Sequence, residues 1–425
     1  TNTISEDEEK VLFEGIGILR NNEKEKDWCE KIIANAYREY GPVKLSKEVV
    51  DNLYGNLLRI SVSTIETYAK CQYSYFVSKG LKWSPREVYE IGVVDTGNLN
   101  HNTLDALGQK LKEQGENFNT VSVSEIDHLI DSTVESVVKE YDEELFKKDK
   151  QTEYYITQLK RIIKRTVDTL GYQLSKGEFA PELFEEGFET SYYLNENKDK
   201  EIVINGRIDR IDVYRDGYSD NEYVKVVDYK SSSKKFKPGM LEAGVSLQLA
   251  LYLKKAVEKI KEMDKGKNVI PGAMLYYAID DPIVSETDNP TKAIRNKLIP
   301  SGAIVQDDKL IHGLDSSIDN EGQSEVIPVN RKNDGSIKSN SVYSVEEFNH
   351  FINRAEEIML EKAVKIFDGN IEINPIKDSG VDACTFCNLK GLCGFDYKIP
   401  GYEARNLNGE VQLESDIDDN AKGDE

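Results

Sequence analysis

Long apolar runs are absent from the 425-residue sequence, and no segment reaches the roughly 18 to 20 uninterrupted apolar residues that a membrane-spanning helix requires. The first residues, TNTISEDEEK, have no basic segment followed by an apolar one, as a secretory signal would. No GxxxxGK[ST] phosphate-binding loop occurs, so an ATPase has no support, and no repeat of about 20 to 50 residues is evident. These absences predict a cytoplasmic, globular protein with no membrane partner.

Positive charge is also scarce, because 55 Lys and Arg stand against 77 Asp and Glu and give a net charge of −22. This balance argues against a nucleic-acid partner, since phosphate binding depends on Lys and Arg. Two local runs are exceptions. Five lysines lie between Lys225 and Lys237, and four basic residues lie in QLKRIIKR, residues 158–165. Each run is either a solvated face or a phosphate-binding patch.

Cysteine is rare as well. The five cysteines are an odd number in a chain without an export signal, so they do not predict a disulfide framework. Hydrophobic residues make up 39% of the chain, and 23 Tyr, 13 Phe and 2 Trp supply the bulk for a sizeable core. The length allows about two to four domains, or one core that carries large insertions.

Helical patterns dominate the first half of the chain. Residues 1–60 look helical, and Ser63 to Glu66 has the form of a capping box that opens a further helix. Apolar residues at spacings of three and four continue from Gly97 to about Glu186, which predicts a helical block.

Strand patterns follow. EIVINGRIDRIDVY and NEYVKVVDYKSS alternate or are rich in β-branched residues, and RDGYSD between them supplies turn residues, so they predict a hairpin. SYYLNE before the hairpin and GAMLYYAI after it are predicted strands. Two amphipathic helices are expected, VSLQLALYLKKAVEKIKEM and VEEFNHFINRAEEIMLEKAVKIFDG, and the second ends near Gly369. Residues 283–345 look like an insertion with short strand-like pieces such as SEVIPV.

The predicted hairpin carries carboxylates that can meet. Asp228 and Lys230 are two residues apart in one strand, so their side chains point to the same face while Tyr229 points to the other. Asp209 lies on the neighbouring strand. Carboxylates from adjacent strands can converge on one Mg²⁺, which takes a few carboxylates together with water. A lysine beside that ion can orient an attacking water. The hairpin therefore predicts a metal site.

Asp212 does not belong to this site by the same reasoning. It is three residues from Asp209, so the two carboxylates face opposite sides of the strand. Asp212 shares its face with Arg210, and we expect the two to form an ion pair.

The order of four elements resembles the PD-(D/E)XK nucleases of the RecB type. GRID followed by VVDYK resembles the core of that family, and QLALY, residues 248–252, resembles its QxxxY element. GNLNH, residues 97–101, resembles its upstream GxxxH element. From spacing alone, the histidine can equally be an ordinary helix residue, and the glutamine and tyrosine a packing pair on one helix face.

The resemblance assigns roles to these positions. It implies that His101, Asp209, Asp228 and the backbone carbonyl of Tyr229 hold the metal, and that Lys230 acts in catalysis with Asp209 and Asp228. It also implies that Gln248 and Tyr252 shape the site and contact DNA.

The cysteines form a second group. Cys384, Cys387 and Cys393 are close in sequence, and a tetrahedral metal or a cluster needs a fourth ligand, for which Cys71 is the candidate. The spacing alone fits zinc as well as iron and sulfur. Cys29 has no partner by spacing and is expected to be a buried small hydrophobe.

A lone cysteine before the nuclease core and a C-x2-C-x5-C group after it resemble the iron–sulfur staple of AddB, the nuclease-bearing component of AddAB helicase–nucleases. SVSTIETYAKCQYSYFVSKGLK, YEIGVVDTGNLNH and GAMLYYAIDDPI resemble segments of the same family. The resemblance implies a 4Fe-4S cluster. A clip between Cys71 and Cys384 would close a very long loop, which favours a structural role for the cluster. The sequence departs from the family pattern at Gln72, where a proline is usual, and at Asp105, where a glutamate is usual.

The resemblance covers about residues 62–399 and implies an α/β, restriction-endonuclease-like core with a central mixed β-sheet flanked by helices. We expect a helical segment over residues 1–60 and a nuclease domain over 61–400. Within that domain we expect a helical insertion at about 102–186 and a loop-rich insertion at about 283–345. An acidic, disordered tail is expected over 401–425. AddB proteins are longer and the chain begins with Thr, so we expect a C-terminal piece.

The predicted function is that of a Mg²⁺-dependent deoxyribonuclease, specifically an exonuclease. The resemblance implies that the protein works beside an AddA-like helicase subunit. Together they would process double-strand DNA ends, and the nuclease would degrade single strands, in recombinational repair. Two alternatives stay open: a stand-alone RecB-like exonuclease, and a non-catalytic iron–sulfur scaffold that binds DNA ends. The lysines near residue 230 are the expected entry point for DNA.

Overall fold

The structure, a computed structural model, describes residues 5–36, 39–86, 92–146, 150–194, 196–286, 289–319, 322–378 and 381–406. Of the predicted acidic tail, residues 407–425 lie outside the described residues. None of the helices in these ranges is long and apolar enough to cross a membrane.

The helices are α1 (Glu6–Arg20), α2 (Lys26–Ala36), α3 (Lys47–Tyr54), α4 (Val62–Lys70), α5 (Gln72–Tyr75), the π-helical turn η1 (Phe76–Gly80), α6 (Val93–Glu113), α7 (Val123–Phe146), α8 (Lys150–Ser175), α9 (Pro238–Glu242), α10 (Gln248–Met263), α11 (Pro290–Lys297), α12 (Asp308–Leu314), the 3-10 turn η2 (Ser316–Asp319), α13 (Val345–Phe367) and α14 (Lys390–Cys393). The strands are β1 (Leu57–Ser61), β2 (Ala180–Tyr193), β3 (Glu201–Arg215), β4 (Asn221–Lys230), β5 (Asn268–Ala278), β6 (Ser301–Val305), β7 (Gly322–Gln323), β8 (Asn330–Arg331), β9 (Ile337–Lys338), β10 (Val342–Tyr343), β11 (Lys377–Asp378) and β12 (Val381–Asp382).

A mixed seven-stranded sheet forms the centre of the described chain, in the order β1-β3-β4-β5-β6-β10, with β2 on the other edge of β3. The strands β3 and β4 are antiparallel, as the predicted hairpin requires, and β4 pairs with β5 in parallel. The strand β1 is parallel to the first part of β3 and β4 is antiparallel to its last part, so one strand holds both neighbours.

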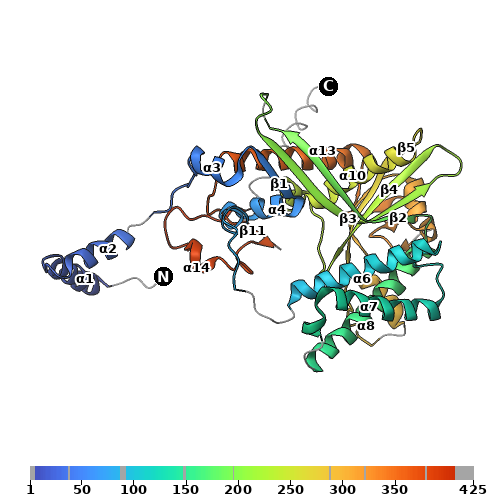
Figure 1. The fold of residues 1–425 in the computed structure, drawn as a ribbon, viewed down its shortest axis with the longest axis horizontal. Helices are drawn as coiled ribbons and strands as arrows, with labels where there is room; N and C mark the ends of the chain where they lie inside the picture. Colours follow the sequence, from blue (N-terminus) through green and yellow to red (C-terminus); the bar gives the residue numbers. More distant parts are fainter. Residues whose placement is uncertain are drawn as a thin grey trace, which may run out of the picture.

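Helices cover both faces of this sheet (Figure 1). One core packs the apolar sides of α4, α10 and α13 against the sheet. The other packs α6, α7 and α8 against side chains of β4 and β5, among them Val227, Tyr229 and Tyr277. Because both faces are covered, β4 is buried along nearly its whole length. This is the α/β architecture that the sequence predicts.

Local sequence explains where the last long helix begins and ends. Ser344 accepts a hydrogen bond from the Glu347 amide, and the Glu347 carboxylate accepts one from the Ser344 amide, which is a capping box. After Phe367 the chain reverses at Gly369, whose φ of +78° favours glycine, as predicted from the sequence. The predicted strand GAMLYYAI and the predicted helix after the hairpin are also confirmed, as β5 and α10.

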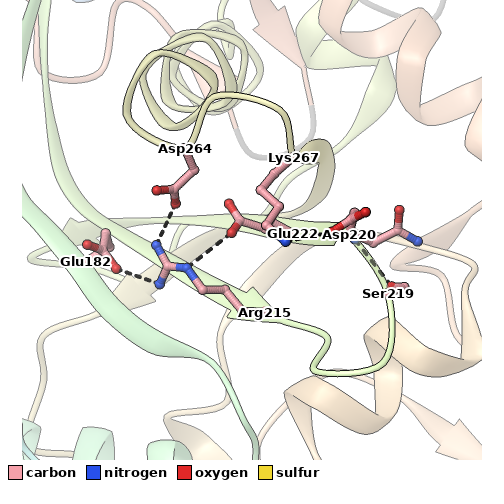
Figure 2. A network of polar contacts seen from close by, with 8 residues as sticks. Glu182, Arg215, Ser219, Asp220, Glu222, Asp264 and Lys267 are labelled. Carbon is pink, nitrogen blue, oxygen red and sulfur yellow. Dashed lines mark hydrogen bonds and ion pairs between the residues drawn. The ribbon is translucent and has the colours of Figure 1, made fainter.

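The turn end of the β3–β4 hairpin is fixed by one arginine. Arg215 lies among three carboxylates from three other elements, Glu182 of β2, Glu222 of β4 and Asp264 after α10 (Figure 2). Its nitrogens lie 2.9, 3.2 and 2.8 Å from the respective oxygens. These pairs connect β2, β3, β4 and the end of α10.

Three expectations from the sequence are wrong in detail. The helical block ends with α8 at Ser175 and β2 begins at Ala180, so it does not reach Glu186. The loop-rich region 283–345 contributes β6 and β10 to the central sheet, and SEVIPV forms no strand. The helix α4 is capped by Ser61, so the proposed capping box at Ser63 does not form.

Candidate metal and nucleic-acid site

The β3–β4 hairpin brings Asp209 and Asp228 to neighbouring positions on one face of the sheet. Arg210 pairs with Val227 in the antiparallel register, so the residue before Arg210 lies beside the residue after Val227. The Tyr229 amide donates a hydrogen bond of 2.6 Å to Oδ2 of Asp209. Both carboxylates are buried, and Asp228 is only 1% exposed.

His101 reaches the same place from the other layer. It lies on α6, which packs against this end of β4, and its Nδ1 is 3.4 Å from Oδ2 of Asp209. Its ring meets the Tyr229 ring edge-on. Burial lowers the pKa of His101, and Lys230 lowers it further, although Asp228 opposes them. A neutral imidazole is the form that binds a metal.

Glu185 is a fourth member of the site that the sequence analysis missed. A nitrogen of His101 and one oxygen each of Glu185 and Asp209 all lie within 4.8 Å of one another. Glu185 lies on β2 with a φ of +49°, an unusual conformation for a residue with a side chain. Pro181 and Gly187 were the available signal, because both are unfavourable inside the predicted helix.

These acidic groups repel one another in a buried place. Burial and the nearby Asp228 carboxylate raise the pKa of Asp209. Burial and then Asp105 raise the pKa of Glu185 to about 7, although Arg207 acts in the opposite direction. Oδ1 of Asp228 has no hydrogen-bond partner among the described residues. An oxygen-rich donor set with one nitrogen fits a hard divalent cation, whose charge would relieve the repulsion.

Lys230 is held at this site by two neighbours. Its Nζ is paired with Oδ2 of Asp228 and donates a hydrogen bond of 3.2 Å to Oε1 of Gln248. The side-chain amide of Gln248 in turn donates a hydrogen bond of 3.2 Å to the hydroxyl of Tyr252, one turn later on α10. Gln248 therefore contacts the lysine directly, and Tyr252 contacts Gln248.

Glu66 fixes the beginning of α10. Its side chain is buried, 5% exposed, and Oε1 accepts hydrogen bonds from the Leu247 amide at 2.8 Å and the Gln248 amide at 3.0 Å. Free amides at a helix start favour such a carboxylate. Because α4 continues from Glu66 to its end at Cys71, this helix connects Gln248 with the cysteines.

Asp212 lies on the opposite face and forms the predicted ion pair. The Arg210 guanidinium contacts both oxygens of Asp212, at 2.8 and 3.0 Å, and Lys225 adds a contact of 2.9 Å. The Tyr229 hydroxyl accepts a hydrogen bond of 3.0 Å from Arg210. All of these groups are buried, and they form a structural cluster behind the metal site.

Four cysteines line one cavity of about 260 Å³ at the C-terminal end of α4. These are Cys71, Cys384, Cys387 and Cys393. Burial raises the pKa of Cys384 to about 11, and Asp382 and the three other thiols add to the rise. No three of the described cysteines bring their sulfurs within 4.8 Å of one another. Cys29 is separate and buried, as predicted.

Comparison with known proteins identifies the family. The profile of the PD-(D/E)XK nuclease superfamily matches residues 59–394. The chain belongs to the PD-(D/E)XK nuclease superfamily. The family resemblance that the motifs indicated is thereby confirmed.

Several relatives of this nuclease are named as the B component of an ATP-dependent helicase/deoxyribonuclease. That of Lachnoclostridium phytofermentans is 33% identical over 89% of the chain, and that of Clostridium acetobutylicum is 32% identical over 85%. That of Alkaliphilus metalliredigens is 28% identical over 92%. The matches cover 33%, 32% and 35% of these relatives, so the nuclease spans about a third of their length.

The two basic runs of the nuclease differ in their surroundings. Every basic side chain of QLKRIIKR is paired with a carboxylate: Lys160 with Asp131 and Glu135, Lys164 with Asp127, and Arg161 and Arg165 with Asp281. That run is a neutralised face. In the second run Lys225 is buried against Asp212, whereas the lysines after β4 line a groove.

Proposed function

We propose that this nuclease is a Mg²⁺-dependent deoxyribonuclease that hydrolyses phosphodiester bonds. The observation that carries the proposal is that ligand atoms of His101, Glu185 and Asp209 lie close together beside Asp228, a buried carboxylate whose Oδ1 has no hydrogen-bond partner among the described residues. His101, Asp209, Asp228 and the Tyr229 carbonyl would hold the ion, and Glu185 extends this set. Magnesium, when bound, supplies a Lewis acid and lowers the pKa of a coordinated water.

The protein's own groups then position the reactants. Lys230 is fixed between Asp228 and Gln248, so its ammonium is available to orient water and to offset charge on the phosphoryl group. Attack in line with the scissile bond forms a new P–O bond while the bond to the leaving sugar oxygen breaks. Gln248 and Tyr252 keep the lysine in place.

The names of the relatives support a finer proposal. We infer that the nuclease acts in an AddAB-type complex, beside an AddA-like helicase subunit, on double-strand DNA ends and the single strands made from them during recombinational repair. Copurification of the nuclease with a large ATPase subunit would support this arrangement. Isolation without one, together with full exonuclease activity, favours the stand-alone alternative.

Incubation with end-labelled linear DNA tests the activity. We expect labelled fragments with Mg²⁺ and none with EDTA. Binding of DNA ends without cleavage at any divalent-ion concentration would favour the non-catalytic scaffold and contradict our proposal.

We further propose that Cys71, Cys384, Cys387 and Cys393 hold a 4Fe-4S cluster. The shared cavity and the resemblance of the cysteine spacing to an iron–sulfur staple support this proposal. Purification without oxygen should give a brown protein with iron and sulfide. A colourless preparation with one equivalent of zinc would support the alternative and overturn this proposal.

Replacing Cys387 with Ala should destabilise the domain, because a clip between residues so far apart in sequence restricts the unfolded chain. By analogy with other cross-links, we expect a loss of about 2 to 5 kcal/mol in the free energy of unfolding. Urea denaturation and iron content measure the effect. Cys29→Ala is the matched control and should retain all iron. Equal stability of Cys387→Ala and the wild type would contradict a structural role.

Replacing Glu66 with Ala should slow cleavage without touching the metal ligands. The backbone amides of Leu247 and Gln248 lose their hydrogen-bond acceptor, so Gln248 no longer holds Lys230 in a fixed position. We therefore expect kcat to fall roughly 10- to 100-fold with little change in KM. Glu66→Gln keeps an acceptor oxygen and should restore most activity. Ser46→Ala, which removes a cap from α3, is the control for loss of a helix cap. An unchanged kcat in Glu66→Ala would show that Gln248 needs no such support.

A further inference from the structure

A groove of about 970 Å³ lies beside Lys230. One wall is the segment that follows β4, and the other is the segment around β12 that carries the cysteines. Figure 1 shows β11 of that second segment next to α4. The lining residues that matter here are Lys70, Trp83, Lys230, Lys234, Lys235 and Phe386.

Positive charge collects in this groove although the chain as a whole is acidic. Lys70, Lys234 and Lys235 form no ion pair with any carboxylate of the described residues. Lys70, Lys234 and Lys235 line the groove together with Lys230, so their ammonium groups share this space. Asp378 and Asp382 also line the groove, so lysines outnumber carboxylates there, and the Asp382 carboxylate accepts a hydrogen bond of 2.8 Å from the Cys384 amide. Such a site favours a polyanion.

Exposed aromatic rings lie among these lysines. Phe386 is 93% exposed and Trp83 is 40% exposed, and both line the groove. Phe386 stands between Cys384 and Cys387, on the loop that forms the cysteine cavity. Aromatic rings beside a basic track are how proteins bind unpaired bases, because every base has a face that can stack.

We propose that this groove binds single-stranded DNA and delivers it to the metal site, with Phe386 stacking on a base and Lys70, Lys234 and Lys235 contacting phosphates. The proposal rests on the proposed nuclease function. Lys230 belongs to both the groove and the metal site, so a strand in the groove leads directly to the reacting bond. A duplex keeps its bases stacked inside and offers Phe386 no free face.

The cysteine cavity shares a wall with this groove. Cys387, Ala383 and Leu389 line both. Whatever the four cysteines hold therefore also fixes the loop that presents Phe386. This gives the cysteine segment a part in substrate binding besides its part in stability.

Fluorescence anisotropy of the full chain in EDTA tests the groove without cleavage, using a labelled single-stranded oligonucleotide and the matching duplex. Phe386→Ala should weaken binding of the single strand about tenfold, and Phe386→Trp should restore it. Lys234→Gln/Lys235→Gln should weaken binding and lower the slope of log affinity against log salt by about 0.7 for each lysine. Tyr218→Ala and Lys261→Gln, which replace exposed residues outside the groove, are the matched controls.

Each outcome bears on one proposal. Groove variants that bind the single strand like the wild type, with the same salt slope, overturn the inference. Equal losses for duplex and single strand also overturn it, because they place a duplex in the groove. If the predicted losses occur but the wild type with Mg²⁺ leaves DNA intact, the groove stands and the nuclease proposal fails.

Discussion

Asp228→Asn is expected to lower the rate of DNA cleavage by roughly 1,000-fold. A catalytic divalent ion contributes several kcal/mol of transition-state stabilisation, and about 1.4 kcal/mol corresponds to a factor of ten in rate. The substitution keeps the shape of the side chain but removes the charge from a residue that is 1% exposed and whose Oδ1 has no hydrogen-bond partner in the described part of the chain. It also removes the carboxylate that pairs with Lys230, which keeps its hydrogen bond to Gln248. Single-turnover cleavage of labelled linear DNA with Mg²⁺ measures the loss.

The stability of the same variant separates lost chemistry from lost folding. Asp228 raises the pKa of Asp209 and contributes to the raised pKa of Glu185, so the native state without metal contains repulsion that the neutral amide relieves. We expect the thermal midpoint in EDTA to stay the same or to rise. Addition of Ca²⁺ should stabilise the wild type more than the variant. Asp220→Asn, at an exposed turn residue, should leave cleavage unchanged. A loss of less than tenfold in Asp228→Asn would remove Asp228 from the site.

The face of each side chain in the hairpin could be predicted because a strand has a period of two. That rule needs only local sequence. It predicted that Asp228 and Lys230 share one face of the sheet, and that Asp212 shares the opposite face with Arg210 and forms an ion pair with it. It could not identify Glu185, which comes from another strand and meets Asp209 only in the folded sheet. The helical pattern around Glu185 concealed the strand because alternating and helical spacings overlap in a short segment.

At Glu66, a contact with a distant part of the chain replaced the local contact that the sequence pattern predicted. Ser63 and Glu66 have the spacing of a capping box, yet the helix begins at Ser61 and the carboxylate turns to the amides of Leu247 and Gln248. Contacts between residues this far apart leave no periodic signal. The short strands β6 and β10 were missed for a related reason, since two to five residues give too little alternation to separate a strand from a loop.

Replacing Asp212 with Ala should be among the most destabilising substitutions in the chain. Arg210 and Lys225 are buried and both are paired with this carboxylate, so its removal leaves two buried positive charges uncompensated. Breaking such a pair typically costs about 3 to 5 kcal/mol in the free energy of unfolding. Urea denaturation measures the change. Asp220→Ala, which breaks the exposed pair with Lys267, is the matched control and should change the free energy of unfolding far less than Asp212→Ala, because exposed ion pairs contribute little.

The pH dependence of unfolding gives an independent check on this cluster. Burial acts to raise the pKa of Asp212, but Arg210 and Lys225 outweigh it and the pKa is lowered overall. A carboxyl group whose pKa is lower in the folded state contributes stability above its unfolded pKa of about 3.9 and loses that contribution as the pH falls further. The wild type should therefore lose this contribution in acid, whereas Asp212→Ala should show a smaller change over the same range. Parallel acid profiles for the two proteins would mean that the ion pair adds no stability.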